Sequence, residues 1–231
     1  MRKLIFPIFI LFIVFASAQT TELSLNGKWN FRKVGDKEWL EATVPGTVHT
    51  DLLKNKKIPD PFFGTNEQIL QWIEDLDWEY KTTFDCSKQI LKSDNVELNF
   101  EGLDTYAKVY LNDSLVLSAE NMFRTWKVDC KKYLREKANE IRIVFESASR
   151  KGKEEARKLP YALPGEEKVF TRKAAYQYGW DWGPRFVTCG VWRPAKIVAW
   201  DNVRIEDIQV IQKKLTDSIA KLTFNFTVMS Q

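Results

Sequence analysis

The sequence has 231 residues, of which 44% are hydrophobic, and its aromatic residues are 15 Phe, 9 Trp and 7 Tyr. This composition excludes an intrinsically disordered chain and predicts a globular body with a substantial core. The formal net charge is only +4. Because basic and acidic residues are interspersed along most of the chain, nothing indicates a nucleic-acid-binding surface.

The first 18 residues have the composition of a secretory signal peptide. Arg2 and Lys3 precede an apolar run over residues 4–15, and the small residues of positions 16–18 follow it. The apolar run is shorter than the roughly 20 residues that a spanning helix needs, and Pro7 interrupts it. We therefore expect cleavage after Ala18 and an exported mature chain without membrane attachment, in the periplasm, the medium or a lysosome.

The three cysteines, Cys86, Cys130 and Cys189, leave two interpretations open. Export permits one disulfide and a free thiol, and the sequence does not say which pair would form it. Alternatively, all three are small buried apolar residues. His49 is the only histidine, and it lies in no cluster with the spacing of metal ligands, so we expect neither a metal nor a cofactor.

The segment that follows the signal alternates apolar and polar residues with the two-residue period of β-strands. This period occurs over residues 78–84, 96–100, 107–111 and 141–145, with turn-forming clusters such as 112–114 between the strands. The pattern predicts an all-β chain built as an antiparallel sandwich or barrel. Helical periodicity is brief, over residues 47–55, 66–76 and 147–158.

The character of the chain changes near residue 201, where we place a domain boundary. Two strands are expected at residues 203–212 and 219–228, separated by a turn. The second strand carries the apolar stripe Leu222, Phe224, Phe226 and Val228, which requires partner strands because an isolated hairpin is marginal in water. We therefore expect residues 201–231 to begin a second domain of a longer protein.

The stretch Gly179-Trp-Asp-Trp-Gly-Pro184 is the most informative motif. Two glycines and a proline exclude a regular helix or a central strand and predict a shaped loop. Rigid indoles that cover the C–H face of a sugar, next to a carboxylate that accepts hydrogen bonds from its hydroxyls, are typical of a carbohydrate site. The alternative is that Trp180 and Trp182 belong to the core and Asp181 caps its own turn.

A series of short motifs follows the chain from residue 25 to residue 184. The motifs are Leu25-Asn-Gly-Lys-Trp29, Val44-Pro-Gly-Thr-Val-His49, Ile58-Pro-Asp-Pro-Phe62, Trp78-Glu-Tyr80, Phe100-Glu-Gly-Leu-Asp-Thr-Tyr-Ala107, Leu111-Asn112, Asn121-Met-Phe123 and Gly179-Trp-Asp-Trp-Gly-Pro184. They occur in the order found at the front of β-mannosidases of glycoside hydrolase family two, which this chain resembles over about residues 22–231. The Gly-Leu-Asp-Thr motif and the Pro-Gly turn are shared with the wider family, whereas Trp-Asp-Trp-Gly-Pro with Asn-Met-Phe marks the mannosidases.

The resemblance implies a jelly-roll β-sandwich similar to galactose-binding domains over residues 19–200, and the first strands of an immunoglobulin-like sandwich over residues 201–231. A (β/α)₈ barrel would follow, holding two catalytic glutamates that remove terminal β-D-mannose with retention. By the same resemblance, Trp180, Asp181 and Trp182 bind the substrate, a β-mannoside oligosaccharide or glycoconjugate.

No catalytic residue is expected in this chain, which should be inactive alone. Two Asn-Glu pairs mimic the acid/base motif of the family, but Glu140 opens a predicted strand, and Glu67 begins a short amphipathic stretch. Two alternatives stay open. The chain is a carbohydrate-binding module that acts by itself, or it is the front of another family-two glycosidase, such as a β-galactosidase.

Overall fold

The computed structural model describes residues 20–230. The described chain divides into two compact units, residues 21–200 and residues 201–230. The signal peptide that we predict for residues 1–18 lies outside the described residues. Within residues 20–230, no helix is long and apolar enough to cross a membrane.

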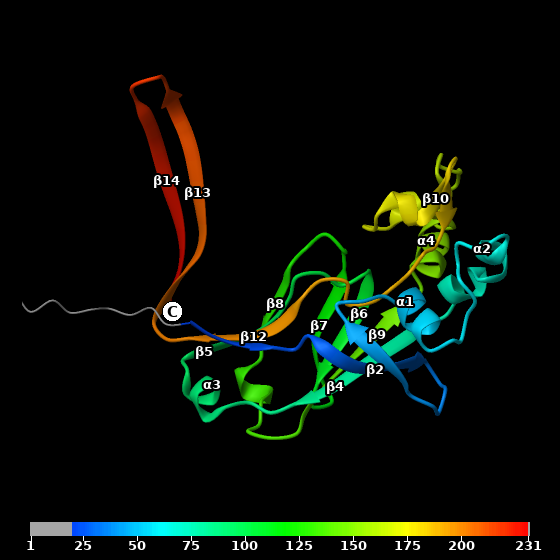
Figure 1. The fold of residues 1–231 in the computed structure, drawn as a ribbon, viewed down its shortest axis with the longest axis horizontal. Helices are drawn as coiled ribbons and strands as arrows, with labels where there is room; N and C mark the ends of the chain where they lie inside the picture. The colour runs from blue at the N-terminus through cyan, green and yellow to red at the C-terminus, as the bar shows by residue number, and fades with distance from the viewer. Residues whose placement is uncertain (1–19, 231) are drawn as a thin grey trace, which may run out of the picture. The chain divides into compact units, whose positions relative to one another are not determined.

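Two β-sheets form the larger unit (Figure 1). One sheet has four strands in the order β1-β12-β5-β8, and the other has six in the order β3-β2-β4-β9-β6-β7. Neighbouring strands of the six-stranded sheet are antiparallel throughout, which confirms the all-β prediction. The strands are β1 (Thr20–Ser24), β2 (Gly27–Lys33), β3 (Leu40–Val44), β4 (Trp78–Phe84), β5 (Asn95–Phe100), β6 (Tyr106–Leu111), β7 (Ser114–Glu120), β8 (Trp126–Asp129), β9 (Asn139–Glu146) and β12 (Ala195–Trp200).

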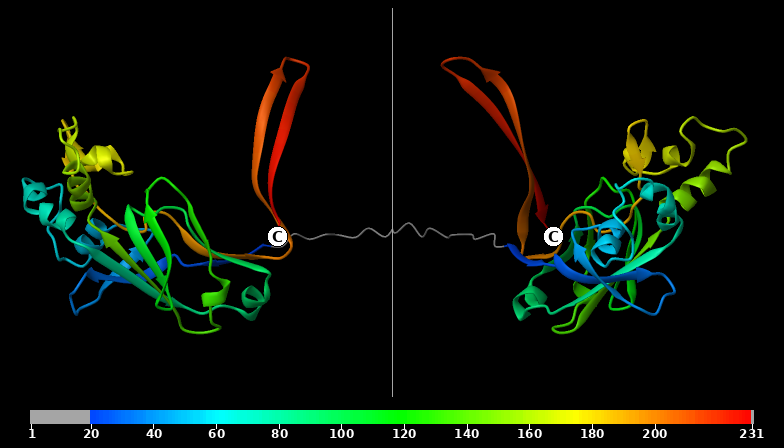
Figure 2. Two further views of the ribbon diagram at one scale, coloured as in Figure 1. Left: turned by 180° about the vertical axis from the view of Figure 1, so that it is seen from behind. Right: turned by 45° about the vertical axis from the view of Figure 1, so that its right-hand side comes forward.

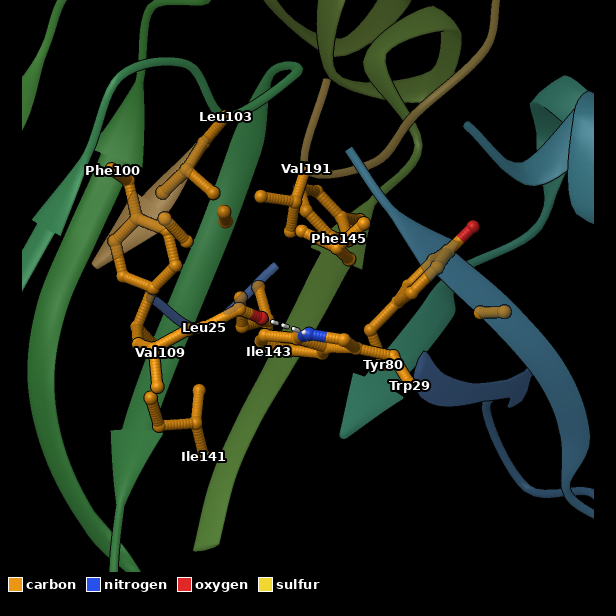
Figure 3. Packing of buried hydrophobic residues seen from close by; sticks show 14 of the residues in the cluster. Leu25, Trp29, Tyr80, Phe100, Leu103, Val109, Ile141, Ile143, Phe145 and Val191 are labelled. Atoms are coloured by element: carbon orange, nitrogen blue, oxygen red, sulfur yellow. Dashed lines mark hydrogen bonds between the residues drawn. The ribbon is translucent and has the colours of Figure 1, made fainter. Parts of the chain in front are cut away.

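The core lies between these two sheets (Figure 3). Strand β9 alternates strictly between buried and half-buried residues, and its Ile141, Ile143 and Phe145 are completely buried. They meet inward-facing residues of the other sheet, such as Phe100. Since both sheets turn one apolar face inward, burial of that face is the main stabilising contribution to the sandwich.

Short helices gather with the small hairpin of β10 (Tyr178–Trp180) and β11 (Gly183–Arg185) at one end of the sandwich, as the views of Figures 1 and 2 show. They are α1 (Val48–Lys54), α2 (Asn66–Ile69), η1 (Gln71–Asp75), α4 (Ala148–Ala156), η3 (Glu166–Phe170) and η4 (Ala175–Gln177). Helix α3 (Lys88–Lys92) and the turn η2 (Lys131–Tyr133) lie elsewhere. The helices expected at residues 47–55, 66–76 and 147–158 are all present, although the second is divided into α2 and η1.

Residues 201–230 form a single long hairpin of β13 (Val203–Leu215) and β14 (Ala220–Ser230). Apolar residues face one another across it, with Ile208 opposite Phe226 and Val210 opposite Phe224. Phe224 and Phe226 are each more than half exposed. The stripe expected from the sequence is therefore formed by both strands, and it stays unburied among the described residues.

All three cysteines are free thiols, so the described chain holds no disulfide. Cys86 and Cys130 are buried, Cys189 is half-buried, and the Cys130 thiol lies 3.4 Å from the carbonyl oxygen of Val96. Burial raises the pKa of the Cys86 thiol to about 11 and that of Cys130 to about 12. Of the two interpretations of the cysteines, the structure agrees with small buried apolar residues.

Helix α1 is tied to the sandwich through a buried carboxyl group. Asp51 is 2% exposed and accepts hydrogen bonds from the backbone N–H of Thr43 and from the Tyr80 hydroxyl, each at 3.0 Å. Burial raises the pKa of Asp51 from 3.8 to about 6, and the hydrogen bonds only partly oppose this shift. The carboxyl group therefore favours folding in its protonated form.

This shift predicts a pH dependence of stability. Between pH 4 and 6 the folded chain holds the Asp51 proton more often than the unfolded chain, so the contribution of Asp51 to the free energy of unfolding falls as the pH rises. Urea unfolding of wild type and Asp51→Asn should show the wild type losing about 2–3 kcal/mol relative to the variant across that interval. A constant difference between the two proteins would contradict the assignment.

Candidate functional site

The Trp-Asp-Trp motif forms the turn of a small hairpin, β10 (Tyr178–Trp180) with β11 (Gly183–Arg185). Trp180 pairs with Gly183, so Asp181 and Trp182 are the two turn residues. The side chains of Trp180 and Trp182 are 55% and 84% exposed, and therefore neither indole belongs to the core. The exposed Asp181 has no hydrogen-bond or ion-pair partner among residues 20–230.

An aromatic groove of about 540 Å³ runs beside this hairpin. The two indoles meet edge to face with their ring centres 5.8 Å apart, and Phe62 meets Phe186 edge to face at 5.4 Å. Both indoles line the groove, whereas Asp181 does not. The lining residues are Phe62, Tyr176, Gln177, Trp180, Trp182, Gly183, Pro184 and Phe186.

Arg185 connects the hairpin to the short helices around it. Its guanidinium donates to the Glu74 carboxylate at 2.6 and 2.9 Å and to Glu167 Oε1 at 2.7 Å. Its backbone N–H donates to Glu67 Oε1 at 2.6 Å, and its carbonyl oxygen accepts from the Gln71 amide at 3.0 Å. One residue at the end of β11 thereby connects the hairpin to α2, η1 and η3.

The charges of this cluster depend on one another. Glu74 and Glu167 are 8% and 7% exposed, so each needs a cation to remain ionised at low cost. Burial opposes the charged form of Arg185, but hydrogen bonds from its guanidinium to the two carboxylates outweigh that effect and raise its pKa. Burial likewise opposes ionisation of Glu167, and the hydrogen bond from Arg185 reverses this and lowers the pKa of Glu167.

A second ion pair, between Lys173 and Asp104, is fully buried. Lys173 Nζ is 2.6 Å from Asp104 Oδ1 and donates to the Thr188 carbonyl oxygen at 2.7 Å. Gln177 donates to Asp104 Oδ2 at 3.2 Å. Burial lowers the pKa of Lys173, and the charge of Asp104 opposes that shift. Lys173 thus connects the two ends, residues 173 and 188, of the segment that carries the hairpin.

His49 packs against Phe186, one of the residues that line the groove. Its Nδ1 lies 3.0 Å from the Thr188 hydroxyl, and its ring meets Phe186 edge to face at 5.4 Å. Burial lowers the pKa of His49 to about 4, and the charge of Lys173 adds to this shift. A histidine that is neutral near pH 7 packs against an aromatic ring without a charge to solvate, so His49 has a local structural role.

The Asn-Glu pairs have structural roles here. Glu67 accepts the Arg185 backbone N–H, and Glu140, on β9, lies 4.0 Å from Lys81. Sequence reasoning missed Phe62, Phe186 and the Arg185 cluster. Phe62 was visible only as the end of the Ile58–Phe62 motif, with no local signal that it meets Phe186. Within residues 20–230 there is no group of three or more His, Cys, Asp or Glu residues that could hold a metal ion.

Replacement of Arg185 should destabilise the fold more than replacement of an arginine in a surface pair. Arg185→Met leaves two buried carboxylates without a cation, and we expect the free energy of unfolding to fall by about 3 kcal/mol. Arg150, whose NH2 group lies 2.6 Å from Asp77, is 40% exposed, so Arg150→Met should cost less than about 1 kcal/mol. Denaturant unfolding of both variants measures this. Equal losses would contradict the anchoring role of Arg185.

Comparison with known proteins agrees with this architecture. Residues 29–193 match the family described as "Glycosyl hydrolase 2 galactose-binding domain-like". The chain is 34% identical over 212 residues to Beta-mannosidase B of Thermothelomyces thermophilus, covering 87% of this chain and 25% of that protein. Beta-mannosidase B of Emericella nidulans is also 34% identical, over 81% of this chain and 23% of its own length.

Solved structures also match this chain. The crystal structure of Beta-D-Mannosidase from Dictyoglomus thermophilum matches with a TM-score of 0.89 and 40% identity, over 91% of this chain and 26% of that one. The exo-chitosanase of Amycolatopsis orientalis, at 19% identity and a TM-score of 0.67 over 91% of this chain and 24% of that one, shows the shared fold alone. The chain spans about a quarter of the length of the curated relatives that it matches. It belongs to the galactose-binding-like domain family of glycosyl hydrolase family 2.

Proposed function

We propose that this chain is the non-catalytic front part of an exported β-mannosidase, to which it contributes one wall of the substrate pocket. The observation that carries the proposal is the pair of exposed indoles at Trp180 and Trp182, held on an anchored hairpin beside an aromatic groove. Relatives named β-mannosidase at 34% and 40% identity support the substrate class. The apolar run of residues 4–15 supports export.

The proposed roles of the two indoles and of Asp181 follow from their chemistry. The indoles cover the C–H face of a sugar and exclude water from its surroundings. The unpaired Asp181 carboxylate accepts hydrogen bonds from sugar hydroxyls, which orients the ring. The acid/base and nucleophilic carboxyl groups of a retaining glycosidase, about 5 Å apart, would lie in a barrel outside this chain.

A module that binds glycans by itself is the second candidate, and the groove on this chain favours it. The two proposals differ in what the chain does alone. A single wall encloses too little of a sugar to bind it well, because small-molecule sites usually bury about 70% or more of the ligand. Calorimetry of the isolated chain with a β-mannoside should therefore detect at most weak binding, and tight binding would favour the module.

The activity of the complete protein is tested by comparing substrates. Nitrophenyl β-D-mannoside should be hydrolysed in preference to nitrophenyl β-D-galactoside, and the product sugar should keep the β configuration when followed by NMR. Preference for the galactoside would assign the chain to another activity of the same family.

The role of Asp181 is tested by substitution in the complete protein. Asp181→Ala and Asp181→Asn should each lower kcat/KM on β-mannosides by about 100-fold, because hydrogen bonds to hydroxyl groups strengthen in the transition state. The control is Asp217→Ala, an exposed residue in the turn of the β13-β14 hairpin, which should leave kcat/KM unchanged. Unchanged kinetics in both Asp181 variants would remove this residue from the substrate site.

A further inference from the structure

We propose that Phe62 is a specificity-determining residue that stacks on the sugar following the terminal mannose, in the aromatic groove beside the Trp180–Trp182 turn. The inference rests on the proposed function and assigns the second sugar of the substrate to a named surface. Phe62 lies in the segment that leads into α2, 118 residues before Trp180 in the chain, and it enters the groove only through the fold.

Phe62 is exposed and yet held in place. Its side chain is 77% exposed, so it contributes little to the core. Its ring nevertheless packs edge to face on Phe186, which packs edge to face on His49, and His49 contacts the Thr188 hydroxyl. The rings of His49, Phe186 and Phe62 thus pack one on the next, from helix α1 to the exposed phenyl group.

The backbone around Phe62 is fixed by side chains of the same turn. The Phe62 N–H donates to Asp60 Oδ1 at 3.0 Å, and the Asn66 amide donates to the Asp60 carbonyl oxygen at 2.7 Å. These bonds restrain the backbone that carries the ring before any ligand arrives. A preorganised aromatic surface loses little conformational entropy on binding, which is what a sugar platform requires.

The groove lining carries no charged side chain. Asp181 lies in the turn outside the lining, whereas Phe62, Phe186 and Pro184 line the groove together with the two indoles. Because the indoles and Asp181 would hold the terminal mannose, the phenyl group of Phe62 is the part of the lining that is left for the next sugar. An uncharged aromatic surface selects for a flat C–H face and tolerates variation in hydroxyl pattern, which suits the neighbouring sugar.

Exposure of the surrounding rings supports a ligand in this position. Tyr176 is 68% exposed and lines the same groove as Phe62 and Trp182. Large aromatic side chains that gather in one place without being buried mark binding surfaces. The neighbouring Phe63 is 75% exposed but does not line the groove, so it provides a matched control.

The test compares Phe62→Ala and Phe63→Ala in the complete protein on two substrates, β-1,4-mannobiose and methyl β-D-mannoside, by release of mannose. Phe62→Ala should lower kcat/KM for mannobiose about tenfold and change that for the methyl glycoside by less than about twofold, because only mannobiose has a sugar to stack. Phe63→Ala should affect neither substrate, and Phe62→Trp should restore the activity on mannobiose.

Equal losses on both substrates would overturn the inference, because they would place Phe62 against the terminal mannose. An unchanged kcat/KM of Phe62→Ala on mannobiose would overturn it as well. Either result leaves the proposed function standing. A complete wild-type protein that hydrolyses neither mannoside would instead overturn the proposed function, and the inference with it.

Discussion

The arrangement of the site depends on the charge cluster around Arg185. A hairpin of two three-residue strands is too short to be stable alone, and this one presents two indoles to solvent rather than burying them. Contacts of Arg185 with η1 and η3 therefore fix the position of the hairpin. The Arg185 guanidinium lies 2.6 Å from a Glu74 oxygen and 2.7 Å from a Glu167 oxygen. Keeping these carboxylates buried is costly unless the cation is present, so the cluster favours one position of β11 over its alternatives.

The strand pattern of the sandwich core was predictable from the sequence, whereas several other strands were not. Residues 141–145 alternate because β9 has one face in the core, and β4 is bounded as expected at residues 78–84. Strand β12 gave no such signal, because residues on both of its faces are buried and its residues 197–200 form a short continuous apolar run. The turn at Asn112 and Asp113 was visible because these residue types tolerate the positive φ angles found there.

The candidate site, too, was only partly predictable from the sequence. Trp180, Asp181 and Trp182 are adjacent in sequence and were identified as one motif, although the structure separates Asp181 from the groove that both indoles line. The contacts that position them are distant in the chain, since Glu67 and Arg185 are 118 residues apart. Such contacts have no local signature, so the anchoring carboxylates resembled ordinary charged residues. The exposed aromatic surface is thus held by interactions that only the folded sandwich assembles.

The fold holds the hairpin in place before any sugar binds, and amide hydrogen exchange of the ligand-free chain tests this most directly. The Arg185 N–H is bonded to Glu67, and the Phe186 N–H donates to the Gln177 carbonyl oxygen at 2.9 Å. Both amides should exchange at least about 100-fold more slowly than in an unstructured peptide, and Arg185→Met should remove this protection. Exchange of both wild-type amides at the unstructured rate would contradict the account.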